Sequence, residues 1–206
     1  MSISLIDYHQ FYEISDPLVN RPLRLDTDGS VSGEMAWQLS RGQLTPGQPL
    51  RLVAAMGGQP APILWTRFPP LVCVHQRVVD LLSQHNFKGW DVYPVEVYGR
   101  KGEPVPDYYG FAITGRGGEV DISRSQLITK PAPTERGRPY QVYRGVYFHP
   151  EQWDGSDLFF VNGHRVVRDT VVKAFKRAKI SNVQLTPLPD EEIDVFAYHL
   201  SRPRSE

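Results

Sequence analysis

Hydrophobic and polar residues alternate along this chain with two periods, one typical of helices and one typical of strands. Apolar residues recur at helical spacing over 71–82 and again over 165–179, which predicts an amphipathic helix in each segment. Aromatic and β-branched runs predict a series of strands. Those strands are expected at 3–14, 23–26, 50–55, 87–98, 108–114, 140–148, 158–161 and 182–187. Prolines and short strands over the first 65 residues predict no helix there.

The two predicted helices belong to a pattern that repeats after 93 residues. At this shift Val78 and Val79 align with Val171 and Val172, and Pro94 aligns with Pro187. Each copy has a helix, a short turn and then a strand that ends in proline. We therefore predict an α+β fold with antiparallel or mixed sheets, few helices, and two related helix-then-strand units.

The predicted boundaries follow from this repeat. A strand-rich N-terminal segment spans 1–66, the first unit spans 67–130, and the second unit spans 140–206. Residues 130–139 are rich in proline and charge, which is typical of a linker. All three parts also fit within one compact domain.

Charge and composition exclude several classes of protein. Of the 206 residues, 23 are Lys or Arg and 23 are Asp or Glu, so the net charge is zero. A neutral chain has no general attraction for nucleic acid or for an anionic membrane. The single cysteine, Cys73, excludes an internal disulfide and a multi-cysteine zinc site. With no secretory signal and no run of about 18 apolar residues, we expect a soluble cytoplasmic protein.

The sequence lacks the usual spacings of catalytic and metal-binding motifs. H-E-x-x-H, G-x-S-x-G and the glycine-rich phosphate loops do not occur, and no two of the six histidines are four residues apart. We therefore assign no catalytic residue, no metal and no cofactor. The enzyme alternative is a small metal-dependent hydrolase or nuclease in which His149, Glu151, Asp154 and His164, close to Trp153 in sequence, meet in space.

Two charged groups are candidates for contact with a partner. Asp190, Glu191, Glu192 and Asp194 form an acidic group that is suited to a basic protein, although a solubilising loop has the same composition. The opposite group lies on the second predicted helix and contains Arg165, Arg168, Lys173 and Lys176. It suggests a nucleic-acid-binding module as a third function, while a solvated helix face is the simpler interpretation.

Aromatic residues near turns are further candidates. Trp153, Tyr108 and Tyr109 are of the type that anchors protein interfaces. Packing in the core is the alternative for each of them.

Several stretches of this chain together resemble a known family. They are Lys88–Val97 (K-G-W-D-V-Y-P-V-E-V), Tyr108–Gly110, Gly115–Gly118, Asp157–Val161 and Val183–Pro187. This pattern of apolar, Trp, Gly and Pro positions resembles family eleven of the polymorphic-toxin immunity proteins, first defined in myxobacteria, over roughly residues 70–190.

The resemblance implies a protein that neutralises a cognate protein toxin by binding it, without catalysis. Related myxobacterial families carry paired C-x-x-C motifs, which suggest zinc, but a chain with one cysteine cannot follow them. If the toxin is a cationic nuclease, the acidic group at 190–194 is the natural mimic of its substrate. We expect neither a membrane nor a nucleic acid as partner.

Overall fold

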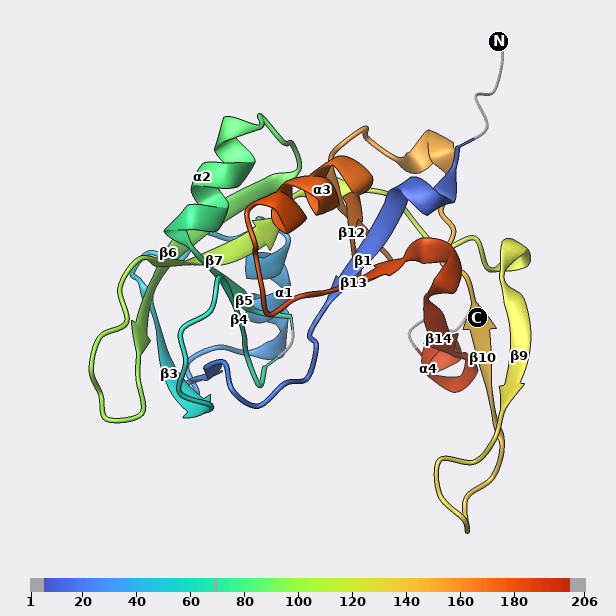
Figure 1. The fold of residues 1–206 in the computed structure, drawn as a ribbon, viewed down its shortest axis with the longest axis horizontal. Coiled ribbons are helices and arrows are strands. Elements are labelled where there is room, and N and C mark those ends of the chain that lie inside the picture. The colour runs from blue at the N-terminus through green and yellow to red at the C-terminus, as the bar shows by residue number, and fades with distance from the viewer. Residues whose placement is uncertain (1–5, 69, 201–206) are drawn as a thin grey trace.

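The chain folds into a body made of two large sheets and an arm made of a third, smaller sheet (Figure 1). The computed structural model describes residues 6–68 and 70–200. Strands and short helices dominate, and the sheets are mixed or antiparallel, which confirms the predicted α+β class.

The first sheet of the body curls until its two end strands meet. It contains β2 (Arg24–Thr27), β3 (Leu50–Met56), β6 (Trp90–Tyr98), β7 (Tyr108–Ile113), β5 (Val72–His75) and β4 (Ile63–Trp65), in that spatial order. Leu25 of β2 forms a parallel bridge with Thr66, and the Arg67 N–H donates to the Leu25 carbonyl at 2.7 Å. The end strands therefore cover each other's edges.

The second sheet of the body includes a strand from the N-terminus of the chain. Its spatial order is β13 (Gln184–Pro187), β1 (Phe11–Ser15), β12 (His164–Arg168), β11 (Leu158–Val161) and β8 (Gly115–Arg116). β1 lies between β12 and β13 and is antiparallel to both. The strands of the first 66 residues are thus shared between the two sheets of the body.

The predicted repeat is present in three dimensions. α2 (Gln76–Gln84) and α3 (Asp169–Arg177) begin and end 93 residues apart. Both helices are followed by a residue with positive φ at the same place in the repeat, Asn86 at 53° and Lys179 at 52°. The backbone bonds that close the helices also correspond, since the His85 N–H donates to the Leu81 carbonyl and that of Ala178 donates to Ala174.

The repeated unit is larger than the sequence pattern indicates. In each copy a hairpin precedes the helix, and an antiparallel strand is inserted between the second hairpin strand and the strand that follows the helix. The inserted strand is β7 in the first unit and β1 in the second. Buried side chains of both helices, including Val78, Leu82, Val171 and Phe175, share one hydrophobic core.

Three sequence-based expectations for local structure were wrong. The first helix begins at Gln76 rather than at 71, because residues 72–75 form β5. The second helix begins at Asp169 rather than at 165, because residues 164–168 form β12. Val166 and Val167 are both fully buried but belong to different cores on opposite faces of that strand. The first 65 residues also contain a helix, α1 (Gly33–Ser40), which begins where the Ser32 hydroxyl accepts a hydrogen bond from the Met35 N–H at 3.2 Å.

The segment expected to be a linker is instead the loop of a hairpin. β9 (Gln126–Lys130) and β10 (Tyr140–Arg144) pair in antiparallel register, with Lys130 opposite Tyr140. β14 (Glu192–Asp194) pairs with the other side of β10 and leads into α4 (Val195–Leu200). We call β9, β10, β14 and α4 the arm.

Candidate partner-binding surface

The arm is fixed to the body at one end by a second hydrophobic core. Tyr143 and Ile193 pack against a buried cluster that includes Phe148 and Leu188. The Tyr198 ring of α4 meets the Tyr143 ring edge-on, with 5.7 Å between the ring centroids. The base of the arm is therefore held by packed aromatic side chains, while its other end extends into solvent (Figure 1).

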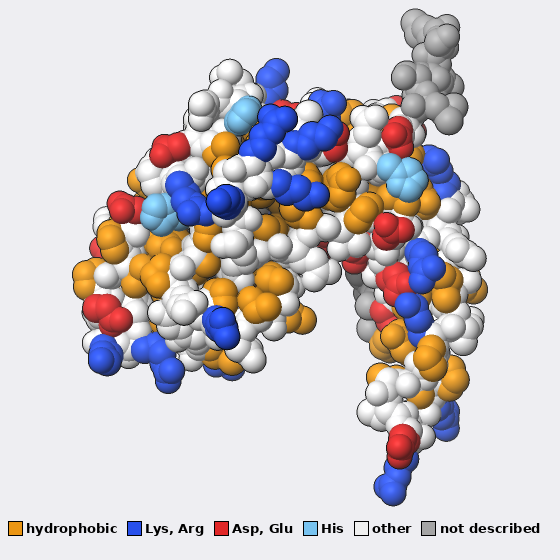
Figure 2. All heavy atoms as spheres, viewed as in Figure 1, with side chains coloured by type: hydrophobic (Ala, Val, Ile, Leu, Met, Phe, Trp, Pro, Cys, Tyr) orange, Lys and Arg blue, Asp and Glu red, His pale blue; other side chains and the backbone are white. Residues whose placement is uncertain are grey.

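Beyond its base, the arm exposes large apolar side chains. Leu127 is 53% exposed, Tyr140 41% and Phe196 73%. A groove beside them is lined by Thr129, Pro139, Tyr140, Gln141, Asp194, Val195 and Phe196. Figure 2 shows an open notch between the arm and the body, so a partner reaches the arm without displacing other elements. Tyr140 and Phe196 line one groove with polar neighbours, and exposed apolar area of this kind is typical of interaction sites. We call Leu127, Tyr140, Asp194 and Phe196 the arm surface.

The four carboxylates of the predicted acidic group have different surroundings. Asp190 and Asp194 are exposed. Glu192 accepts hydrogen bonds from Lys130 and Arg144, each at 2.8 Å, and these bonds lower the pKa of its carboxyl. Glu192 is therefore already neutralised within the arm.

Glu191 belongs to a half-buried group where the arm meets the second sheet. The Nδ1 atom of His164 lies 3.0 Å from the Glu13 carboxylate. Burial, and then the negative charge of Glu13, raises the pKa of the Glu191 carboxyl to about 7. Burial opposes the charged form of His164, but its hydrogen bond to Glu13 outweighs this and raises the pKa of the imidazole. Glu191 therefore faces inward, toward Glu13, rather than toward solvent.

Nothing in the sequence pattern predicts that Glu13 lies close to His164 and Glu191. It lies 151 residues from His164 along the chain. Only the insertion of β1 beside β12 brings the two side chains together.

The three aromatic candidates lie on the body rather than on the arm. Tyr108 is only 6% exposed, and its hydroxyl donates to the Ala61 carbonyl at 2.7 Å. Almost none of the Tyr108 ring is accessible to solvent, as expected if Tyr108 packs in the core. Tyr109 is half-buried on the same strand. Trp153 is also half-buried, and its ring meets that of Phe11 edge-on at 5.3 Å.

Of the four residues of the hydrolase alternative, His149 and Glu151 lie close together, whereas His164 and Asp154 have other partners. His149 lies 3.7 Å from Glu151, and His164 contacts Glu13. Asp154 accepts hydrogen bonds from the backbone N–H groups of Arg116 and Ser156. Within residues 6–68 and 70–200, no three His, Cys, Asp or Glu side chains are grouped so as to hold a metal ion.

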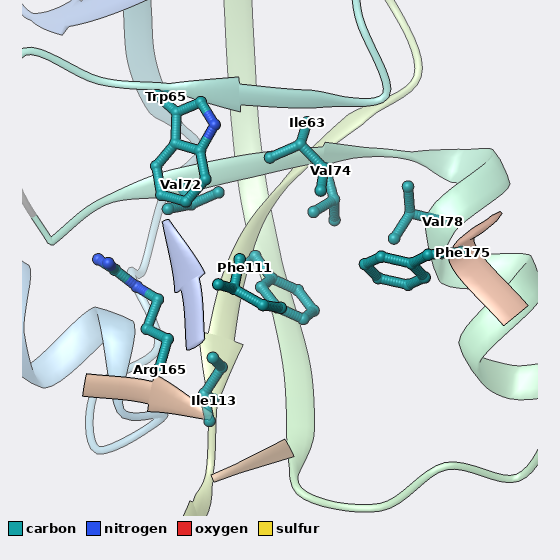
Figure 3. A pocket seen from close by; sticks show the side chains of 10 residues that line it. Ile63, Trp65, Val72, Val74, Val78, Phe111, Ile113, Arg165 and Phe175 are labelled. Carbon is teal, nitrogen blue, oxygen red and sulfur yellow. The ribbon is translucent and has the colours of Figure 1, made fainter. Parts of the chain in front are cut away.

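The predicted basic face is divided between a strand and a helix. Arg165 of β12 lines a small cavity of about 20 Å³ in the shared core, where its guanidinium lies over the Trp65 ring at 5.7 Å (Figure 3). It also donates to the Pro70 carbonyl at 2.7 Å. Lys173 pairs with Asp169 at 2.7 Å, and Lys176 is exposed.

Comparison with known families places the chain among immunity proteins. The model of the Imm11 immunity protein family matches residues 32–190, which is most of the chain. The chain therefore belongs to the Imm11 immunity protein family, and the resemblance found in its sequence is confirmed. None of the curated proteins matches this chain. Among the helices of the described residues, none has the length and apolar character needed to cross a membrane.

Proposed function

We propose that this member of the Imm11 family binds a cognate protein toxin of a polymorphic toxin system and neutralises it without catalysis. In this proposal the protein acts in the cytoplasm of the bacterium that it protects against competitors. The observation that carries the proposal is the arm surface, which presents apolar side chains on an extension that is open to solvent.

The composition of the arm surface suits a protein partner. Interfaces commonly have an apolar, aromatic centre and a polar rim. Tyr140 and Phe196 supply exposed apolar area to the groove, which also has the polar side chains of Thr129 and Gln141, and Leu127 adds exposed apolar area elsewhere on the arm. A toxin that covers this area buries side chains that water otherwise surrounds.

Charge gives this surface a preference for a cationic toxin. Asp194 lines the groove and Asp190 is exposed four residues before it. Glu192 contributes little because Lys130 and Arg144 already neutralise it. Asp190 and Asp194 are the exposed members of the predicted acidic group, and we propose that they contact the toxin. Glu191 is half-buried at the base of the arm, and we do not propose that it contacts the toxin.

Affinity capture from the lysate of the native host tests the proposal. The tagged chain is compared with the double variant Leu127→Ser/Phe196→Ser and with the control Met56→Ser, which alters a 46% exposed apolar residue on the body. We expect one protein with a toxin domain to bind the wild type and the control in equimolar amount at high salt, and to bind the double variant much less. That toxin domain must also kill cells unless the chain is co-expressed. Capture of no such toxin, or killing that co-expression does not prevent, would overturn the proposal.

A further inference from the structure

β9 lies at the outer edge of the arm, and one side of this strand is unpaired. Its inner side bonds to β10 over all five residues from Gln126 to Lys130. In the part of the chain that the structure describes, no strand, side chain or turn bonds to its outer side. An open strand edge carries unpaired N–H and C=O groups, which are a template for another strand.

The outer edges of β2, β4 and β8 are covered. The end strands of the six-stranded sheet bridge each other at Leu25 and Thr66. At the edge of the second sheet, Asp154 bonds to both backbone groups of Arg116 in β8, as donor at 3.0 Å and as acceptor at 2.9 Å. The open edge of β9 therefore contrasts with the covered edges of these three strands of the body.

β9 also lacks the features that normally prevent strand pairing. Proteins guard exposed edges with charged side chains, with proline or with bulges. The strand contains no proline and pairs with β10 in continuous register. Its only charged residue, Lys130, pairs with Glu192 at 2.8 Å across the sheet, so its charge is directed into the arm rather than over the edge. Leu127, at 53% exposure, gives the strand an apolar side chain as well.

The sequence of β9 is complementary to itself in one antiparallel register. With Ile128 opposite Ile128 of a second copy, Leu127 faces Thr129 and Gln126 faces Lys130. A register centred on Leu127 instead places Lys130 opposite Arg124, which belongs to the 3-10 helix Ile122–Arg124, so this register leaves Lys130 without a strand partner. A register centred on Thr129 places Leu127 opposite Pro131, which has no N–H to donate.

We propose that β9 pairs antiparallel with β9 of a second copy, centred on Ile128, so that two arms form one six-stranded sheet. The twofold axis of such a pair is perpendicular to the sheet. Equivalent faces of the two arm sheets therefore lie on the same side of the six-stranded sheet. Two short strands form a small interface, so the dimer forms reversibly in the micromolar range of concentration. This pairing does not depend on the proposed toxin.

Sedimentation of the purified chain over a range of concentrations tests the proposal. We expect the wild type to pass from monomer to dimer as the concentration rises. Leu127→Lys adds a guarding charge at an exposed site, so this variant should stay monomeric and keep the wild-type melting temperature. Met56→Lys, at a 46% exposed position of a covered strand, should dimerise like the wild type. A wild type that is monomeric at all concentrations, or a Leu127→Lys variant that dimerises normally, would overturn the proposal.

Cysteine cross-linking tests the register itself. Residues directly opposite in antiparallel strands have Cα atoms about 4.5–5.5 Å apart, which suits a disulfide. Ile128→Cys should therefore form a disulfide-linked dimer under mild oxidation, whereas Gln126→Cys, whose partner is Lys130, should form no disulfide-linked dimer. The native Cys73 does not interfere, because it is 1% exposed and burial raises the pKa of its thiol to about 12. Equal cross-linking of both variants, or of neither, would contradict this pairing.

Discussion

Substitution of Phe196 by alanine tests whether the toxin binds the arm surface. Burying a phenylalanine side chain contributes about 1.5–3 kcal/mol. In the free protein this side chain is 73% exposed. A toxin that covers it therefore gains about 1–2 kcal/mol from burial. Phe196→Ala should lose that gain, which raises the Kd about 5- to 30-fold.

Isothermal titration calorimetry with the purified toxin domain measures this change. The thermal midpoint of free Phe196→Ala should stay close to that of the wild type, because most of the side chain already contacts water. Met56→Ala, which removes a 46% exposed side chain from the body, is the matched control and should bind with wild-type Kd. If Phe196→Ala binds as tightly as the wild type, or if the control weakens binding equally, the arm surface is not the interface.

Three further predictions concern the fold and its dependence on pH. The Glu191 carboxyl has an ordinary pKa of 4.5 and a folded pKa of about 7, so its burial destabilises the fold increasingly as the pH rises between these values. Glu191→Gln should raise the free energy of unfolding by about 1 kcal/mol at pH 8, after a discount for partial exposure, and by nothing near pH 4; urea denaturation showing no gain at pH 8 would contradict this. Gly89 has a φ of +90°, and a Cβ there would collide with the Leu158 carbonyl, so Gly89→Ala should cost more than about 2 kcal/mol. Gly102→Ala, at a φ of +82° in open space, should cost only about 1 kcal/mol, and equal costs would show that the collision is relieved. Phe175→Ala, at a 2% exposed site beside the 20 Å³ cavity, should lose about 3–5 kcal/mol in the same assay, and a loss under about 1 kcal/mol would mean that the core closes around the gap.

The repeat is predictable from the sequence because its signal is local. Apolar spacing identifies both long helices, and a shift of 93 residues aligns one with the other. The predicted start of α3 is misplaced because Val166 and Val167 are both buried, one on each face of β12. Adjacent buried residues break the alternation that normally reveals a strand.

Features that depend on contacts between residues far apart in the sequence cannot be predicted from the pattern of hydrophobic and polar positions. The charged, proline-containing segment 130–139 has a linker's composition, and only the pairing of β9 with β10 makes it a hairpin loop. The pattern does not reveal α1, because this eight-residue helix buries only Ala36, Leu39 and Ser40. The contact of Glu13 with His164 arises from the placement of the N-terminal strand in the second sheet, which neither residue's neighbours indicate.

Titration of the toxin's own activity against this protein tests neutralisation by binding most directly. A fixed amount of the toxin domain is mixed with increasing amounts of the purified chain, and residual toxicity is measured after short and long incubation. Neutralisation by binding predicts that activity falls in proportion to the added chain, reaches zero at a fixed molar ratio near one, and does not change with time. Loss of all toxin activity at a small fraction of that ratio, progressing with time, would show that the chain inactivates its target catalytically and would contradict the proposal.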